Sequence, residues 1–364
     1  MSSKHVSEGR DYWRWVESRN RSYSGYWRLK LKFSIRLNND LSITEYRNIA
    51  IQADSLGFDQ LWISNDLFLR SAPVILSDLA SKTKNIRLGT CILNPYTIHP
   101  AEIAMLAATL SEITNGRFNL GISCGASEFL DWVGIPHIKP KTHLEESVKI
   151  IKSLLTGEKI RNYGDFFDFK PEAYMRFKDS HHIPIYIGGV GPNIQSLAGE
   201  IADGLLPLLL PPETYVNAKE NVSKGLKLAK RTHSNFDLVG SIWVSASTDI
   251  NQARDALGEK IAYFGNAMPQ EILDKIKVPR EAFKPISHAL NHKHDKKLAL
   301  SLVTDNMLKV GITGTEFDIR EKLEPLIHMG ADHISFGPPL GPNPEESLNV
   351  LANVKNHFTI NPNT

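Results

Sequence analysis

A glycine-rich turn offers the most specific binding chemistry in this sequence. Gly188, Gly189, Val190 and Gly191 stand between an apolar run and a helix that Pro192 can begin. Glycines leave backbone N–H groups unshielded, and beside the positive end of a helix such groups bind phosphate. Glycines also serve simple tight turns, because they adopt backbone conformations that other residues avoid. The spacing alone therefore leaves two interpretations open, a phosphate site and a plain turn.

The other candidate side chains share one property, since each lies at or shortly after the end of an apolar run that is typical of a strand. They are Arg36, Asn65, Asp66, Cys91, Ile92, Leu93, Asn94, Tyr96, Cys124, Gly125 and Glu128. Carboxylates can move protons, and an arginine attracts acidic groups. We interpret the two cysteines as buried, inert thiols rather than a redox pair.

The elements that would position these residues follow a regular alternation. From residue 31 onward, short apolar runs alternate with amphipathic helical runs, which is typical of βαβ units. The eight predicted strands are residues 31–37, 58–64, 86–92, 116–123, 183–187, 204–210, 238–245 and 333–336. No GxGxxG motif follows the first strand, which argues against a dinucleotide-binding open sheet. The sequence therefore predicts an α/β protein with a closed (β/α)8 TIM barrel, whose candidate residues meet at the C-terminal ends of the strands.

Three segments depart from this alternation. Residues 1–30 form a basic and aromatic N-terminal extension, which could contact single-stranded nucleic acid but more simply packs on the body or on another subunit. Residues 159–170 read as a hairpin, and residues 266–308 as a helical insertion over the barrel mouth. Histidines in that insertion lack a metal-ligand pattern, so we predict no metal site. Residues 31–364 are expected to form one barrel domain.

Composition limits the possible functions further. Lys and Arg number 42 and Asp and Glu 40, giving a net charge of +2, too balanced for a dedicated nucleic-acid binder. Two cysteines cannot form a disulfide framework or a four-cysteine metal site. Apolar stretches are far shorter than the roughly 20 residues that cross a bilayer, and no secretory signal opens the chain. We therefore expect a cytoplasmic enzyme without membrane contact.

Three longer motifs resemble a known family. They are IPIYIGGVGPNIQSLAGEIADGLL (183–206), LGTCILNPYTIHPAEIA (88–104) and FGPPLGPN (336–343). Together and in this order, they resemble the bacterial-luciferase-like superfamily, and within it the methylenetetrahydromethanopterin reductases, which use the deazaflavin coenzyme F420. The resemblance runs from about residue 31 to the C-terminus. It implies a luciferase-like (β/α)8 barrel with a flavin or deazaflavin at its mouth, and at least a homodimer.

The resemblance also assigns roles to residues of this chain. It implies a non-prolyl cis peptide at Cys91–Ile92 behind the coenzyme ring, with Leu93 and Asn94 facing the ring or its side chain. It places the coenzyme phosphate at residues 188–191, in agreement with the reading of the turn itself. We expect Cys124 and Gly125, at the end of the neighbouring strand, to complete the coenzyme site.

The chain departs from the family pattern at three positions. Arg36 stands where the family commonly has a glutamate, Asn65-Asp66 where it has Asp-His, and Ala126 where it has an acidic residue. Proton handling would then fall to Asp66, Asn65 or Glu128, while Arg36 and Tyr96 would contact substrate. These departures put the methanopterin reaction in doubt.

Three functions remain open at this stage. The first is hydride transfer between F420 and a small organic substrate, such as a C1-carrying pterin. The second keeps the fold but uses FMN and oxygen, as a monooxygenase does. The third is a barrel without a cofactor that acts by binding.

Overall fold

Ten parallel strands form the sheet of this protein. The computed structural model describes residues 31–360 except 159, 161–163, 171, 178–180, 211 and 269, so the predicted extension 1–30 lies outside the described residues. The strands are β1 (Lys32–Leu37), β2 (Gln60–Ile63), β3 (Arg87–Thr90), β4 (Phe118–Ile122), β5 (Ile185–Ile187), β6 (Gly204–Leu205), β7 (Asp237–Leu238), β8 (Gly240–Ala246), β9 (Gly311–Gly314) and β10 (His333–Leu340).

The sheet closes on itself. Its strand order is β7-β6-β5-β4-β3-β2-β1-β10-β8-β9, and every pairing is parallel. Only Val239 separates β7 from β8, and its N–H donates to the carbonyl of Leu205 at 3.0 Å. One chain segment therefore pairs with β6 by its first half and with β10 by its second, which joins the two sides of the sheet. The predicted (β/α)8 barrel is confirmed.

Strand β9 is the element that the sequence did not predict. It pairs with β8 at Trp243–Ala246 and so extends that strand's side of the sheet without forming a ninth strand of the barrel wall. Its sequence, GITG, has only two residues between glycines, too short to stand out as an apolar run.

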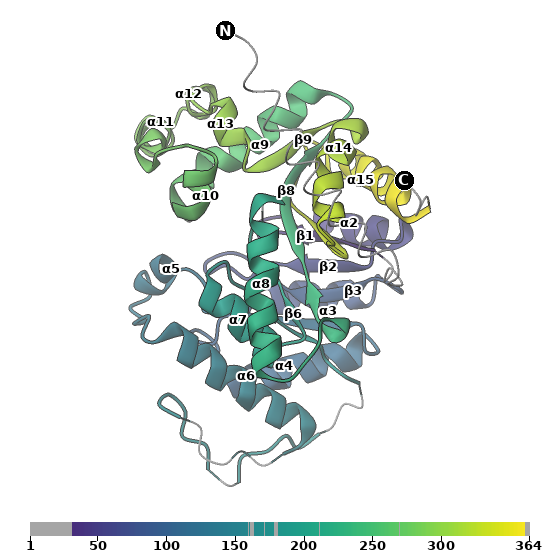
Figure 1. Ribbon diagram of the computed structural model, residues 1–364, viewed down its shortest axis with the longest axis vertical. Coiled ribbons are helices and arrows are strands. Elements are labelled where there is room, and N and C mark those ends of the chain that lie inside the picture. Colours follow the sequence, from purple (N-terminus) through teal and green to yellow (C-terminus); the bar gives the residue numbers. More distant parts are fainter. Residues whose placement is uncertain are drawn as a thin grey trace.

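Helices surround the sheet (Figure 1). They are α2 (Ile43–Ser55), α3 (Ala72–Ala80), α4 (Pro100–Ile113), α5 (Ser127–Asp131), α6 (Pro140–Thr156), α7 (Pro192–Ile201), α8 (Pro212–Leu228), α9 (Ile250–Phe264), α10 (Gln270–Lys275), α11 (Lys284–Asn291), α12 (Lys296–Ser301), α13 (Asp305–Leu308), α14 (Glu316–His328) and α15 (Pro344–Ile360). Local chemistry fixes the ends of several. Ser42 caps α2 in a reciprocal capping box with Glu45, and Gly57 follows in the left-handed region at φ +72°.

Successive side chains of a strand point alternately toward the helices and into the barrel, so the interior has two regions. On β1, Phe33, Ile35 and Leu37 pack into the main hydrophobic cluster against the helices. Ser34 and Arg36 alternate with them, so they point into the barrel. The interior of the barrel is accordingly polar and aromatic, and the apolar core lies between sheet and helices.

A buried polar network fills the N-terminal end of the barrel. The imidazole of His333 lies 3.0 Å from Asp237 through Nδ1 and 2.8 Å from Ser34 Oγ through Nε2. Tyr186 and Lys32 donate to the same Asp237 carboxylate at 2.9 and 3.0 Å. The order Ser–His–Asp is that of hydrolases, but Ser34 and His333 are fully buried at the N-terminal end of the barrel, away from the strand ends where barrels bind substrates. We assign this network to structure.

The helical insertion forms a separate packing unit. Residues 250–308, here called the helical block, contain α9–α13 and pack around their own hydrophobic cluster, which includes Leu209 and Trp243 of the barrel. Figure 1 shows this block beside β9, at the opposite end of the molecule from α4 and α6. Helices α10–α13 occupy most of the predicted insertion 266–308. The predicted hairpin 159–170 lies partly outside the described residues, and residues 164–170 show a turn and no strand.

Candidate functional site

The C-terminal ends of β3, β4 and β5 meet at the barrel mouth. The Cys91–Ile92 peptide bond is cis, as the family resemblance implied. Leu93 then rejoins the sheet, donating to Gly121 at 2.9 Å and accepting from the N–H of Ser123 at 3.0 Å. A Cβ on Gly188 would lie 3.0 Å from Ile92 Cγ2, so the β5 end packs directly on the cis peptide.

Asn94 ties the β3 and β4 ends together. Its amide nitrogen donates to the carbonyl of Cys124 at 2.9 Å, and its amide oxygen accepts from the backbone N–H of Tyr96 at the same distance. Gly125 has φ +65°, and a Cβ there would lie 2.9 Å from the Asn94 side chain. These four residues therefore form one fixed loop pair at the mouth.

The glycine turn after β5 is open to a ligand. Among the described residues, the backbone N–H groups of Gly189, Val190 and Gly191 have no hydrogen-bond acceptor. Gly191 caps α7 without a side-chain hydrogen bond, and a Cβ at this position would meet nothing within 4 Å. Unbonded N–H groups at the positive end of a ten-residue helix suit a phosphate.

Two predicted site residues are held by local contacts instead of facing an open space. The ring of Tyr96 stacks on His143 with centroids 3.9 Å apart, its hydroxyl donates to the carbonyl of Ile138, and burial raises its pKa to about 12. The Cys124 thiol donates to the carbonyl of Pro140 at 3.1 Å, and burial raises its pKa to about 12. Cys124 is therefore a poor nucleophile at neutral pH.

Arg36 lies inside the barrel at the end of β1. Its side chain is 1% exposed, and Nη1 donates to the carbonyl of Pro207 at 3.2 Å. Nη2 has no hydrogen-bond partner among the described residues. Burial lowers the pKa of Arg36 and raises that of the Cys91 thiol, which lies against the guanidinium. Gly337 provides the room, because a Cβ there would lie 2.5 Å from Nη2.

Asp66 shares this space with a lysine that the sequence did not single out. Burial raises the pKa of Asp66, and the nearby charges of Lys260 and Arg36 act in the opposite direction. Burial, followed by the charge of Arg36, lowers the pKa of Lys260 to about 7. Its Nζ lies 3.6 Å from the ring centroid of Phe264 and 5.2 Å from that of Trp243. Lys260 lies on α9, and one lysine on an amphipathic helix gives no signal in sequence.

Asn65 and Glu128 lie apart from the Arg36 and Asp66 group. The Asn65 amide oxygen accepts from the N–H of Ala72 at 3.0 Å, which positions the start of α3. Glu128 stands on the short helix α5 with its side chain exposed. Proton handling by either residue stays a prediction.

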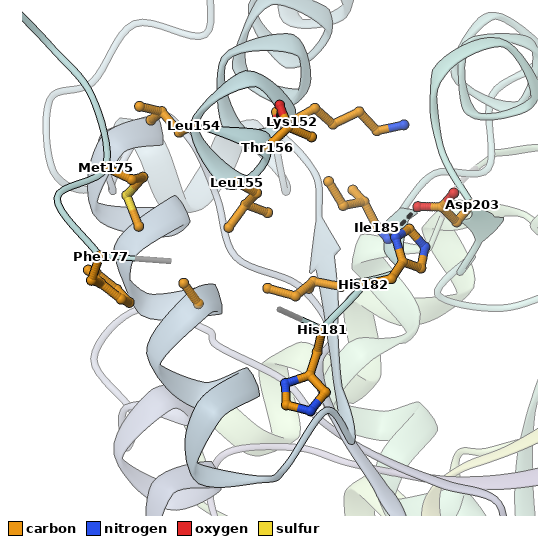
Figure 2. A pocket seen from close by; sticks show the side chains of 12 residues that line it. Lys152, Leu154, Leu155, Thr156, Met175, Phe177, His181, His182, Ile185 and Asp203 are labelled. Atoms are coloured by element: carbon orange, nitrogen blue, oxygen red, sulfur yellow. Dashed lines mark hydrogen bonds between the residues drawn. The ribbon is translucent and has the colours of Figure 1, made fainter. Parts of the chain in front are cut away.

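A separate cavity of about 430 Å³ lies at the other end of the barrel (Figure 2). Lys152 of α6 lines it, together with His182 before β5 and Asp203 before β6. Asp203 accepts from the backbone N–H of Ile185 at 2.9 Å, the dashed line in Figure 2. Because these residues precede their strands, the cavity does not belong to the mouth.

Two features typical of other function classes are absent from the described residues. No group of three or more His, Cys, Asp or Glu side chains in this part of the chain is arranged to hold a metal ion. No helix within the described ranges combines the length and apolar character needed to cross a membrane.

Known proteins are similar to this chain in sequence and fold. Methylenetetrahydromethanopterin reductases from Archaeoglobus fulgidus and Methanolobus tindarius are 33% and 32% identical, over 88% and 86% of this chain and 98% and 94% of theirs. The structure of the F420-dependent reductase from Methanopyrus kandleri superposes with a TM-score of 0.84 at 27% identity, covering 91% of this chain and all of that one. A family model described as luciferase-like monooxygenase matches residues 27–333. The chain therefore belongs to the luciferase-like monooxygenase family.

Proposed function

We propose that this protein is an F420-dependent oxidoreductase, which transfers a hydride between the deazaflavin and a small organic substrate. The observation that carries the proposal is the glycine turn at 189–191, whose N–H groups stand at the barrel mouth and have no acceptor in the described part of the chain. Two relatives support F420 as the coenzyme: a methylenetetrahydromethanopterin reductase that covers 88% of the chain, and an F420-dependent glucose-6-phosphate dehydrogenase that covers 80% of it.

The residues at the mouth suit such a coenzyme. The N–H groups of Gly189–Gly191 would hold its phosphate. The Cys91–Ile92 peptide and Leu93 would lie behind the ring, and Asn94 would fix the loop that carries them. When bound, F420 supplies a donor or acceptor of two electrons and one hydrogen, so the protein's own task is to orient the ring and to exclude water.

A methylene-pterin C1 carrier is the first substrate to assay, because two relatives that are 33% and 32% identical to this chain are named for it. We further propose that the protein works as a homodimer or higher oligomer in the cytoplasm. Light scattering of the purified protein tests the oligomeric state.

FMN-dependent oxygenation is the second candidate, because the matched family model is described as a monooxygenase. An anaerobic fluorescence titration with F420, repeated with FMN, separates the two. Tighter binding of F420 supports the oxidoreductase, tighter binding of FMN together with oxygen consumption supports the monooxygenase, and binding of neither supports a cofactor-free barrel.

Two variants test the placement of the site in that titration. Asn94→Asp puts a negative charge in the loop pair, and Gly189→Trp fills the turn, where even a Cβ would meet Ile194 at 2.4 Å. Both should weaken coenzyme binding severely. Glu158→Trp, at an exposed position after α6, is the matched control, and circular dichroism verifies that each variant is folded.

A further inference from the structure

Three hydrogen-bond donors at the mouth lack an acceptor. Nη2 of Arg36 and Nε1 of Trp243 have no partner within the described part of the chain, although their side chains are 1% and 3% exposed. Lys260, half-buried, forms no ion pair or hydrogen bond with the described residues. Buried donors without an acceptor are costly, so in native proteins such a donor calls for a water, an ion or a functional role.

The strand register brings these donors to one place. Ile35 of β1 pairs with Phe336 of β10, and Gly337, the next residue, pairs with Trp243 of β8. Arg36 and Trp243 therefore stand on either side of Gly337, whose missing side chain leaves room for the guanidinium. Helix α9 places the Nζ of Lys260 over the face of the Trp243 ring.

The charged groups and aromatic rings around Lys260 come from four elements or the loops that follow them. Arg36 lies on β1, Asp40 follows β1, Asp66 follows β2, and the rings of Trp243 and Phe264 lie on β8 and α9. The two carboxylates balance the two cations, so the site is close to neutral while its donors stay unsatisfied.

This arrangement discriminates between substrate chemistries. A cationic iminium group, the form in which a methylene group on a pterin nitrogen accepts hydride, has no lone pair that could accept from these donors. A carbonyl oxygen would accept from the free donors and would be stabilised as it gains negative charge. Building on the proposed function, we infer that the substrate's reacting group is a carbonyl, with its oxygen held by Arg36 and Trp243 and protonated by Lys260.

The step balances in atoms and electrons. The carbonyl carbon gains one hydrogen with two electrons from the reduced deazaflavin, which is oxidised. The π pair of the C=O bond moves to oxygen, and the oxygen takes a proton from the ammonium of Lys260, so the product is an alcohol. Lys260 is left as a neutral amine. A pKa near 7 suits a group that must both give and regain this proton at neutral pH.

The experiment first measures the affinity for F420 in the wild type and in the two variants named below, Lys260→Arg and Lys297→Met, and this affinity must be the same in all three. Reduced F420 is then assayed with acetone, cyclohexanone and benzaldehyde, and separately with methylenetetrahydromethanopterin. We expect turnover of a carbonyl compound, with kcat/KM falling as the pH rises through about 7. Lys260→Arg keeps a positive donor that cannot lose its proton, so it should lower kcat/KM about 100-fold and remove that pH dependence. Lys297→Met, at an exposed position of the same helical block, is the control.

A second measurement needs no coenzyme. NMR titration of the lysine ε-CH2 groups, assigned with Lys260→Arg, should show Lys260 titrating near 7. Titration near 10, or F420 binding with turnover of the pterin and of none of the carbonyl compounds, would overturn the inference while leaving the proposed function intact. Failure to bind F420 would overturn both.

Discussion

Gly191→Asp should stabilise the fold slightly and strongly reduce the affinity for the coenzyme. Gly191 is the N-cap of α7, its backbone is extended at φ −75° and ψ 146°, and the space around its Cβ position is empty. An aspartate fits there without strain, and its carboxylate would accept from the first N–H groups of the helix. Aspartate exceeds glycine as an N-cap by only a few tenths of a kcal/mol, so the gain in the free energy of unfolding is small.

The same carboxylate competes with the phosphate. It occupies N–H groups that the phosphate would use, and it adds a like charge about 4–5 Å from it. Such a pair costs about 1 kcal/mol in water and about 3–4 kcal/mol at the effective dielectric of a protein surface. Because this mouth is partly open, about 1–3 kcal/mol is expected, a 5- to 150-fold rise in Kd.

Fluorescence titration with F420 measures the Kd, and urea denaturation measures stability. Gly191→Asn is the matched control, because it caps the helix equally well and carries no charge, and its Kd should rise far less. An unchanged F420 affinity in Gly191→Asp, with the helix still capped, would refute the phosphate assignment of this turn.

Three further predictions concern stability and reactivity. Asp237→Ala should lower the free energy of unfolding by about 3–5 kcal/mol in urea denaturation, because it leaves His333 and Tyr186 buried without their acceptor. The pKa of Asp237 is lowered, despite burial, by His333 and Lys32, so its stabilisation is present above the unfolded pKa near 4 and is lost as the pH falls through the lower folded value. Tyr96→Phe should change kcat/KM less than threefold in steady-state assays, since the lost hydroxyl bonds a backbone carbonyl. With a pKa of about 12, Cys124 is only about 0.01% thiolate at pH 8, so a disulfide reagent should modify it only after unfolding.

The barrel was predictable because it rests on a repeated local pattern. Eight apolar runs with helical runs between them specify parallel pairing, and the predicted ranges overlap the observed strands. Strand β9 was not predictable, because its pairing with β8 depends on the fold and not on its own two central residues. The capping box of Ser42 and Glu45 is a contrasting case, because it joins residues only three apart in the sequence and does not depend on the rest of the fold.

Much of the candidate site was predictable from glycines, family motifs and the ends of predicted strands. The turn at 188–191 and the loop after β3 were found in this way, and so were Arg36 and Asp66. Lys260 was not, because it lies on a helix far along the chain and meets Arg36 and Asp66 only through the fold. The absence of a side chain at Gly337, which makes room for Arg36, is equally invisible without the paired strands.

The separate packing of the helical block has an evolutionary consequence. Residues 250–308 have their own apolar core and join the barrel through a few side chains, Trp243 among them. The proposed coenzyme loops lie across the barrel, on β3, β4 and β5. Substitutions within the block can therefore change its packing without disturbing the loops that we propose for the coenzyme. Of the three residues proposed to hold the substrate, only Lys260 lies in the block, so a graft of residues 250–308 between relatives would exchange that residue and keep Arg36 and Trp243 in the barrel.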